Sequence, residues 1–275
     1  MNSIVTLTTD FGLSDPFVGI MKGVMLGINP AIRIIDISHQ IEPYNIIQAY
    51  YILNFSYKYF PLGTIHVSVV DPGVGSTRRA ILVESKDCCF VGPDNGIFSF
   101  IFTLSPFTSK ERDGLRVIEL TETKFFLPSV SHTFHGRDIF ASVAAHLTRG
   151  VNPLEFGKPI HNPVTLNIPE PDIQEGKIRG EVIYIDKFGN LITNISARYF
   201  YPHGGMEKEF QQIFIKNLII NPPCKSYSDA EDLKPSSLFN SWGFLEIFIK
   251  NSNASRELGV KKGERIAIIT IDKIR

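Results

Sequence analysis

Residues 69–79 of the chain read Val69-Val70-Asp71-Pro72-Gly73-Val74-Gly75-Ser76-Thr77-Arg78-Arg79. The preceding run, residues 64–70, is largely apolar and β-branched, which predicts a buried strand, and residues 80–83 begin another apolar run. The proline and two glycines between these runs predict a tight turn, although Asp-Pro-Gly is a common turn triplet on its own. Asp71 thus ends a buried strand, and the guanidinium of Arg78 follows seven positions later, which suggests a functional site.

The chain ahead of this turn alternates between strand and helix patterns. Residues 4–9 and 32–37 are short and apolar, whereas residues 17–28 carry apolar side chains at helical spacing. A second helix is expected to begin near Asn45. This alternation predicts an α/β domain with a mostly parallel sheet and helices packed on it.

Two carboxylates close strands of this predicted sheet. Asp10 follows the strand at residues 4–9, and Asp71 follows the strand at residues 64–70. Ligands of α/β sheets bind outside the carboxyl ends of the strands. We therefore expect Asp10 and Asp71 to face one crevice.

The pattern of the sequence changes after residue 158. Four prolines fall between residues 159 and 172, which indicates a linker. Beyond them helical periodicity largely disappears, and short strand patterns separated by turns predict a small all-β, barrel-like domain. The sequence thus predicts an α/β N-terminal domain at 1–158, a linker at 159–172 and a β-barrel C-terminal domain at 173–275.

The composition describes a globular protein without a strongly charged partner. Of 275 residues, 43% are hydrophobic, and 28 basic residues balance 28 acidic ones, so neither nucleic acid nor a membrane is expected as a partner. The first residues lack a basic leader and a long apolar run, so no signal peptide is expected. The three cysteines, Cys88, Cys89 and Cys224, do not suggest a disulfide framework, and a cytoplasmic location is expected.

Seven short motifs are spread in order over nearly the whole chain. They are Thr9-Asp10-Phe11-Gly12, Asp71-Pro72-Gly73-Val74-Gly75 with Arg78, Gly92-Pro93-Asp94-Asn95-Gly96, Phe134-His135-Gly136-Arg137-Asp138, Asp186-Lys187-Phe188-Gly189-Asn190, Asn240-Ser241-Trp242-Gly243 and Asn253-Ala254. Each is weak alone, but the ordered set resembles the S-adenosyl-L-methionine hydroxide adenosyltransferases, which are relatives of fluorinase and chlorinase.

This resemblance implies an N-terminal α/β domain, a C-terminal β-barrel and a homotrimer. The nucleoside would bind between one subunit's N-terminal domain and a neighbour's C-terminal domain. The implied reaction is attack of water or hydroxide on C5′ of S-adenosylmethionine, which releases adenosine and L-methionine. S-adenosylmethionine would be the substrate, and neither a metal nor another cofactor is expected.

The resemblance assigns the catalytic roles to Asp71, Arg78 and His135. Because the sulfonium is already a good leaving group, the protein mainly has to align a water behind C5′ in a dry pocket. Asp71 could accept the proton of that water, while Arg78 holds the carboxylate in a charge-assisted pair and His135 orients the water or Asp71. That pair favours the ionised carboxylate, so alignment with late proton removal is expected rather than free hydroxide. The neighbouring Arg79 is expected to be a solvated strand residue.

Substrate contacts are also implied, and each has a simpler structural explanation. In the N-terminal half, Asp10 would bind the ribose diol or merely form a turn. Asp15 would bind the methionine amino group, or it or Ser14 would cap the following helix, with Pro16 at the first helical position. Tyr44 would lie near the substrate or belong to the core.

In the C-terminal half, Phe188 would stack on adenine and Asn190 would bind its edge, although both also suit a hairpin turn. Ser241 would bind the methionine carboxylate, and Ala254 would offer its backbone to adenine. Trp242 and Asn253 complete the implied set. Trp242 and Ser252 are unusual in their segments, so the methionine end of the pocket is left open.

Three other functions compete with hydrolysis. Fluorinase and chlorinase have a tyrosine in place of Asp71 and differ at His135-Gly136, with a tyrosine and a serine near the halide. A carboxylate at Asp71 would repel an anionic nucleophile. A metallohydrolase could use His132, His135 and Asp138, but Gly136 interrupts that segment. A protein that binds S-adenosylmethionine without turnover is the third, and a measurable excess of adenosine over spontaneous decay would exclude it.

Overall fold

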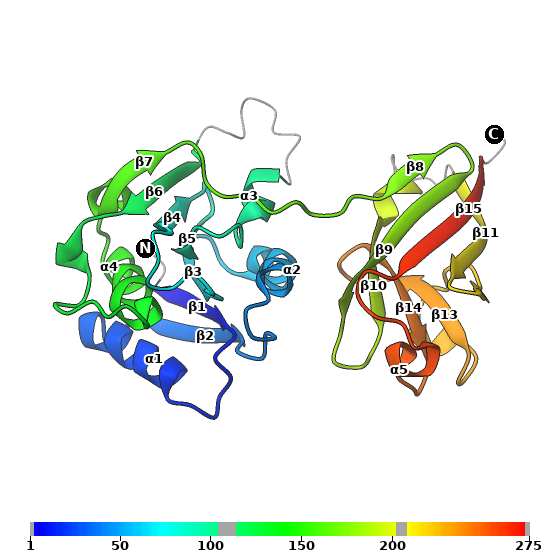
Figure 1. Ribbon diagram of the computed structural model, residues 1–275, viewed down its shortest axis with the longest axis horizontal. Helices are drawn as coiled ribbons and strands as arrows, with labels where there is room; N and C mark the ends of the chain where they lie inside the picture. Colours follow the sequence, from blue (N-terminus) through cyan, green and yellow to red (C-terminus); the bar gives the residue numbers. More distant parts are fainter. Residues whose placement is uncertain (1–2, 104–113, 202–207, 273–275) are drawn as a thin grey trace. The chain divides into compact units, whose positions relative to one another are not determined.

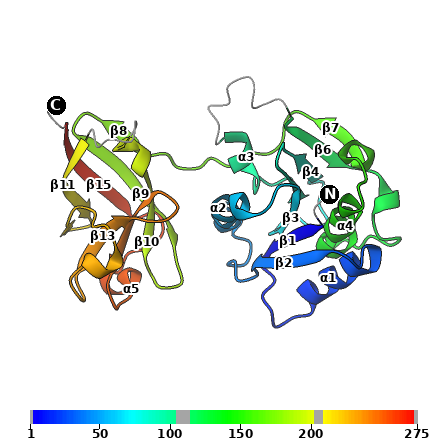
Figure 2. The same cartoon turned by 180° about the vertical axis from the view of Figure 1, so that it is seen from behind.

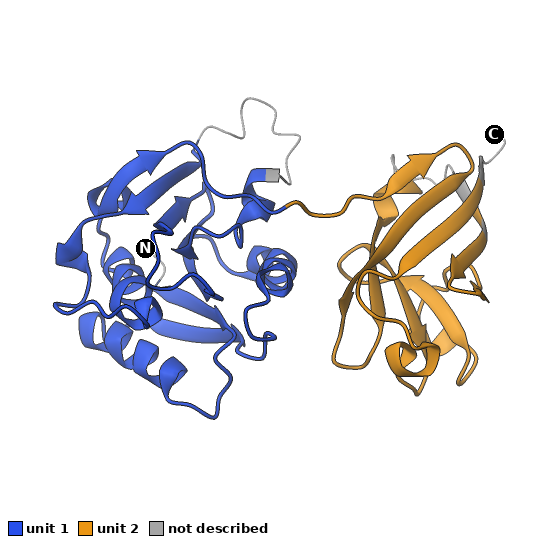
Figure 3. Ribbon diagram, viewed as in Figure 1, with its two compact units in different colours: residues 1–166 blue, residues 167–275 orange. Residues whose placement is uncertain are grey.

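The computed structural model describes residues 3–103, 114–201 and 208–272. It divides the chain into two compact units, residues 1–166 and 167–275 (Figure 3). Each unit has its own sheet and its own hydrophobic core. The predicted order of a helix-containing domain followed by an all-β domain is confirmed. Among the described residues, no helix has the length and apolar character needed to span a membrane.

Unit 1 is built on a seven-stranded sheet with the order β2-β1-β3-β5-β4-β6-β7 (Figure 1). The pairs β2/β1, β1/β3 and β3/β5 are parallel, whereas β5/β4, β4/β6 and β6/β7 are antiparallel. The strands are β1 (Ile4–Thr9), β2 (Arg33–Ser38), β3 (Thr64–Val69), β4 (Ala80–Glu84), β5 (Cys88–Pro93), β6 (Arg116–Leu120) and β7 (Gly157–Ile160).

The sheet of unit 1 is therefore mixed, and the prediction of a mostly parallel sheet is wrong. The alternation of strand and helix that led to it covers only β1 to β3, which do pair in parallel with their neighbours. Residues 85–87 alone connect β4 to β5. So short a connection can only return the chain antiparallel, because a parallel pair needs a long crossover.

Helices cover both faces of this sheet (Figures 1 and 2). On one side, α1 (Phe17–Ile28) and α4 (Ser142–Thr148) share a core with Val5 and Leu7 of β1. On the other side, α2 (Ile46–Ser56) and α3 (Ser99–Thr103) pack through the aromatic rings of Tyr50 and Phe100. A π-helical turn, η3 (Gly136–Ala141), precedes α4, and short 3₁₀ turns are η1 (Tyr57–Tyr59), η2 (Thr123–Phe125) and η4 (Pro153–Phe156).

Of the two predicted helix starts, the one at α1 is wrong and the one at α2 is confirmed. The cap position of α1 is Pro16, without a side-chain hydrogen bond, so the prediction of a Ser14 or Asp15 cap and of proline inside the helix is wrong. The backbone of Pro16 already has helical angles, which shifts the boundary by one residue and leaves no capping geometry for Asp15. The start of α2 near Asn45 is confirmed, because the Asn45 side chain accepts the N–H of Gln48 at 2.9 Å.

Unit 2 is an antiparallel sheet with the order β12-β11-β15-β9-β10-β14-β13, and β8 pairs separately with β9. Beyond β12, the segment at Cys224 forms a bridge with Leu238 of β13, so the two ends of the order approach each other as in a barrel. The elements are β8 (Asp172–Gln174), β9 (Lys177–Ile185), β10 (Leu191–Ser196), η5 (Ala197–Tyr199), β11 (Lys208–Ile215), β12 (Leu218–Ile220), η6 (Tyr227–Asp229), β13 (Pro235–Phe239), β14 (Phe244–Ile249), α5 (Ala254–Leu258) and β15 (Arg265–Asp272).

Arg79, expected to be solvated, is tied into unit 1 instead. Its Nε donates to Asp94 at 2.7 Å, and its Nη1 and Nη2 donate to the side-chain and backbone oxygens of Asn162 at 2.8 and 2.6 Å. The other oxygen of Asp94 accepts the N–H of Val164 at 2.8 Å. No local sequence pattern indicates a partner 83 positions away. The network fixes the end of unit 1 onto β4 and β5.

We expect Arg79→Met to destabilise unit 1 strongly. It leaves the carboxylate of Asp94, whose side chain is 1% exposed, without its cation. Removing one partner of such a pair costs on the order of 3 kcal/mol. The matched control is Arg179→Met, which removes an exposed pair with Asp172 and should cost less than about 1 kcal/mol. Urea unfolding measures both, and equal losses would contradict the assigned role of Arg79.

Candidate active site

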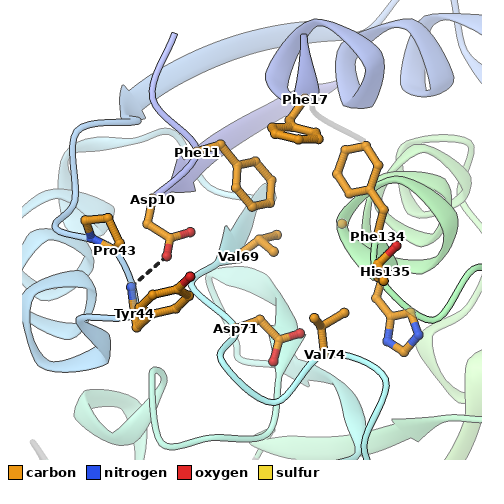
Figure 4. Close-up of a pocket in the computed structure, with 12 residues that line it drawn as sticks. Asp10, Phe11, Phe17, Pro43, Tyr44, Val69, Asp71, Val74, Phe134 and His135 are labelled. Carbon is orange, nitrogen blue, oxygen red and sulfur yellow. Dashed lines mark hydrogen bonds between the residues drawn. The ribbon is translucent and has the colours of Figure 1, made fainter. Parts of the chain in front are cut away.

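A pocket of about 350 Å³ lies at the carboxyl ends of β1 and β3 in unit 1 (Figure 4). Asp10 and Asp71 both line it, so the prediction that these carboxylates face one crevice is confirmed. The remaining lining residues are largely apolar: Phe11, Phe17, Pro43, Tyr44, Val69, Val74, Thr133, Phe134, His135 and Gly136.

Asp71 and Arg78 form an ion pair at this pocket. The Nε of Arg78 lies 2.9 and 3.0 Å from the two carboxylate oxygens, and its Nη2 lies 2.5 Å from Oδ2. Both side chains are at most 10% exposed, so water screens the pair little. Charge-assisted bonds of this kind are strong and directional. Arg78 therefore fixes the orientation of the Asp71 carboxylate.

The same guanidinium reaches His135. Its Nη2 lies 2.8 Å from Nδ1 of the imidazole. Because arginine can only donate, Nδ1 is the acceptor and the proton of the neutral ring belongs on Nε2. Burial and then the positive charge of Arg78 lower the pKa of His135. A neutral His135 held in this way can donate from Nε2 but has no free lone pair with which to act as a base.

The loop from Asp71 to Arg78 depends on a glycine at position 75. Gly75 has φ +78°, and a Cβ added there would lie 2.3 Å from the carbonyl oxygen of His132. Both observations exclude a side chain, since the left-handed backbone disfavours one and the contact leaves no space. The close approach brings the loop against the segment that carries His135.

A buried carboxylate holds the segment around His135. Asp138 accepts the N–H and the hydroxyl of Ser131 at 2.8 and 2.7 Å and the Nε of Arg137 at 2.5 Å. Burial alone would raise the pKa of Asp138, but these hydrogen bonds lower it overall. His135 itself stands at the cap position of the π-helical turn η3, and such turns often occur at functional sites.

The proposed metal ligands do not form a cluster. Asp138 is engaged by Ser131 and Arg137, His135 faces the guanidinium of Arg78, and His132 is exposed. In the part of the chain that the structure describes, no group of three or more histidine, cysteine and acidic side chains is placed to hold a metal ion. The geometry of His135 and Asp138 therefore favours a hydrogen-bonded site over a metal centre.

Asp10 is linked to Tyr44 across the mouth of the pocket. One oxygen of Asp10 accepts the backbone N–H of Tyr44 at 2.9 Å, and the other points away from it (Figure 4). Burial raises the pKa of Asp10, the Tyr44 bond opposes this, and the charge of Asp71 adds a smaller increase. Tyr44 is 72% exposed and has φ +67°, so a core role for it is excluded. A strained exposed aromatic at a pocket is typical of a ligand contact.

In unit 1, one predicted substrate residue lies outside the pocket, and one group of pocket residues was not predicted. Asp15 is exposed and does not line the pocket. Sequence reasoning also missed the aromatic wall of Phe11, Phe17 and Phe134, whose ring centroids lie 5.3–5.8 Å apart. Phe11 and Phe134 stand beside motif residues, but nothing in the sequence indicated that they meet Phe17.

In unit 2, the turn between β9 and β10 carries Phe188 and Asn190. Asp186 organises it by accepting the N–H groups of Phe188 and Asn190 at 2.9 and 2.8 Å and the amide of Asn190 at 3.1 Å. A Cβ on Gly189 would lie 2.2 Å from Asn253, the N-cap of α5, so the turn packs against the start of that helix. The structure thus brings Phe188, Asn190, Asn253 and the buried Ala254 into one region, and Phe188 is 76% exposed.

Ser241 and Trp242 line another pocket, which lies in unit 2 and also has a volume of about 350 Å³. It is lined by Asp186, Lys225, Ser226, Tyr227, Leu238, Phe239, Asn240, Ser241, Trp242 and Glu246. Asp186 connects this pocket to the turn described above. Sequence reasoning missed Asp186 and Glu246 as site residues, although Asp186 opens one of the quoted motifs.

Comparison with known proteins finds one family whose two domains match residues in the two units. Residues 5–157 match the SAM hydroxide adenosyltransferase N-terminal domain, and residues 180–267 match the C-terminal domain of the same family. A protein from Methanocaldococcus jannaschii named (R)-S-adenosyl-L-methionine hydrolase is 39% identical over 97% of this chain and 95% of its own length. A protein of the same name from Thermus thermophilus is 32% identical over 96% of this chain and 99% of its own.

A more distant relative and a solved structure are also similar to this chain over nearly its full length. A fluorinase from an Actinoplanes species is 23% identical over 97% of each chain. The crystal structure of an uncharacterized conserved protein from Thermotoga maritima superposes with a TM-score of 0.85 at 34% identity, covering 97% of this chain and 99% of that one. The matched domains, the shared identity and the ordered motifs confirm the resemblance: this chain belongs to the SAM hydroxide adenosyltransferase family.

Proposed function

We propose that this protein hydrolyses S-adenosyl-L-methionine to adenosine and L-methionine. The relatives that are 32–39% identical over nearly the full length are named (R)-S-adenosyl-L-methionine hydrolases. The observation that carries the proposal is the continuous contact from Asp71 through Arg78 to His135 beside a pocket with an aromatic wall. Such a pocket suits a nucleoside, and the polar set suits a single aligned water.

The polar set assigns separate tasks to its members. A water oxygen forms a bond to C5′ as the bond from C5′ to sulfur breaks, and the bonding electrons leave with the methionine sulfur. The carboxylate of Asp71 accepts the proton of the water, because Nδ1 of His135 is occupied by Arg78. His135 is left to donate from Nε2 and orient the nucleophile or the carboxylate. The alignment of these groups accounts for the rate, since the sulfonium needs little help to leave.

Halogenation fits the site less well. The carboxylate of Asp71 lines the pocket, where it would repel a halide. A Cβ at Gly136 would lie 3.3 Å from both Met21 and Phe134, so a serine there would be crowded. Three fluorinases among the relatives are 22–25% identical to this chain.

We further propose that the enzyme is a cytoplasmic homotrimer that needs no metal or added cofactor. Asp10, Tyr44, Asp71 and His135 belong to unit 1, whereas Phe188, Asn190, Ser241, Trp242, Asn253 and Ala254 belong to unit 2. In the family picture, one chain supplies the first set and a neighbouring chain supplies the second. The exposed Phe188 is then available to the adenine, and Asp10 in the pocket of unit 1 contacts the ribose. Asp15 is exposed and not in the lining of this pocket, and its proposed contact is with the methionine amino group.

The product of turnover tests the proposed reaction. Incubation with S-adenosylmethionine should yield adenosine and methionine faster than buffer alone, and water enriched in ¹⁸O should label the adenosine 5′ oxygen. Saturating chloride should give no 5′-chloro-5′-deoxyadenosine, because Asp71 disfavours an anionic nucleophile. Chromatography of the nucleosides checks both. Chlorinated nucleoside would contradict hydrolysis, and the absence of any enzymatic product would indicate a binding protein.

Mixing two inactive variants tests the shared site. Asp71→Ala inactivates the unit 1 half of a site, and Asn190→Ala inactivates the unit 2 half. If the two chains are present in equal amounts and a trimer assembles at random, about a quarter of the sites pair two intact halves and should be active. The matched control mixes Asp71→Ala with Arg78→Ala, which damage the same unit and should regain nothing. Activity per site in demonstrably mixed oligomers is the measurement. No recovery in the first mixture would argue for sites built within one chain.

A further inference from the structure

The unit 2 pocket is lined by a buried carboxylate, Glu246, to which none of the roles above has been assigned. Glu246 lies in β14, is 3% exposed and lines the pocket that also contains Ser241 and Trp242. Both of its oxygens are used: Oε1 accepts the hydroxyl of Tyr227 at 2.6 Å, and Oε2 accepts the side-chain amide of Asn240 at 3.1 Å. Burying a carboxylate is costly, so a residue of this kind needs such partners to be tolerated.

The hydrogen bond from Asn240 to Glu246 determines how the turn at residues 240–244 lines the pocket. Because Nδ2 of Asn240 donates to Glu246, its Oδ1 must face the opposite way, where it accepts the N–H groups of Trp242 and Phe244 at 3.0 and 3.2 Å. These bonds close the turn between β13 and β14. Glu246 thus selects the amide orientation of Asn240, and that orientation holds the turn that presents Ser241 and Trp242.

The bond to Tyr227 controls the facing wall. Residues 225–227 line the pocket and lie between β12 and β13, at the start of the 3₁₀ turn η6. The Tyr227 ring packs edge-on against Phe248 with centroids 4.8 Å apart, and its hydroxyl ends on Glu246. The carboxylate of Glu246 therefore binds both Asn240 and Tyr227, so it holds two parts of the pocket lining against β14.

We propose that Glu246 is a positioning residue for substrate binding, acting through Asn240 on Ser241 and Trp242 and through Tyr227 on the facing wall. This inference rests on the proposed function, because it takes S-adenosylmethionine as the ligand of the pocket. Glu246 does not touch the reacting atoms in this account. Its loss is expected to affect KM and substrate binding while leaving kcat within a few-fold.

A reversal of hydrogen-bond polarity tests the proposal. Asn240→Asp places a carboxylate against Glu246 in place of the donor, so the turn should shift and KM should rise roughly tenfold, as expected when a charged hydrogen bond is lost. The double variant Asn240→Asp with Glu246→Gln restores a donor and an acceptor in the opposite order. The amide oxygen introduced by Glu246→Gln can still accept from Tyr227, and the carboxylate introduced by Asn240→Asp can still accept from Trp242 and Phe244. The KM of the double variant should return toward wild type.

Trp242 provides a second readout that does not need turnover. It is the single tryptophan of the chain, so intrinsic fluorescence reports on the 240–244 turn directly. Acrylamide quenching should differ from wild type in Asn240→Asp and revert in the double variant. The matched control, Glu231→Gln, neutralises an acid of the same domain whose side chain is 70% exposed and should change neither KM nor quenching.

The outcomes separate this inference from the proposed function. A wild-type protein without S-adenosylmethionine turnover overturns the function, whereas the quenching data still decide whether Glu246 sets the turn. Wild-type turnover with an Asn240→Asp variant of unchanged KM overturns the positioning role. A double variant no better than Asn240→Asp alone, in KM and in quenching, also overturns it. Recovery of both quantities supports the inference.

Discussion

The guanidinium of Arg78 is the constraint on which the candidate site depends. It donates to both oxygens of Asp71 and to Nδ1 of His135, so a single planar group sets the positions of two side chains that come from distant segments. Lysine could not do the same, because an ammonium lacks the fixed fork of donors. The surrounding structure serves this contact. Gly75 allows its loop to approach the backbone at His132, and Asp138 fastens the segment that carries His135.

This constraint also decides the chemistry that each residue can perform. An imidazole whose Nδ1 accepts from arginine, and whose pKa is lowered by burial and by that charge, is neutral near pH 7 and donates from its other nitrogen. In the proposed reaction, proton removal then falls to Asp71. A carboxylate held by arginine is better suited to aligning water and taking its proton late than to generating free hydroxide. The same logic of fixed hydrogen-bond direction recurs in unit 2, where Glu246 sets the amide of Asn240.

Much of this could be predicted from the sequence wherever the signal was local. The turn residues around Asp71, the apolar strands that end at Asp10 and Asp71, and the change of pattern after residue 158 were sufficient for two domains and a crevice. The prediction of a mostly parallel sheet failed on a local feature, because the β4–β5 connection is too short for a crossover. The other failures depended on contacts distant in sequence: Arg79 binds Asp94 and Asn162, and the wall formed by Phe17 required packing that no motif encodes. Glu246 could not be identified because a buried acid in an apolar strand has no pattern of its own.

The kcat of Arg78→Lys tests the central claim most directly. A lysine preserves the positive charge but cannot hold both oxygens of Asp71 and Nδ1 of His135 together. Misplacement of reacting groups by about 1 Å can cost roughly 10²-fold in rate. We therefore predict a loss of at least that order in kcat, with the KM for S-adenosylmethionine and the melting temperature little changed. A folded Arg78→Lys protein that hydrolysed S-adenosylmethionine within a few-fold of the wild-type rate would contradict the account.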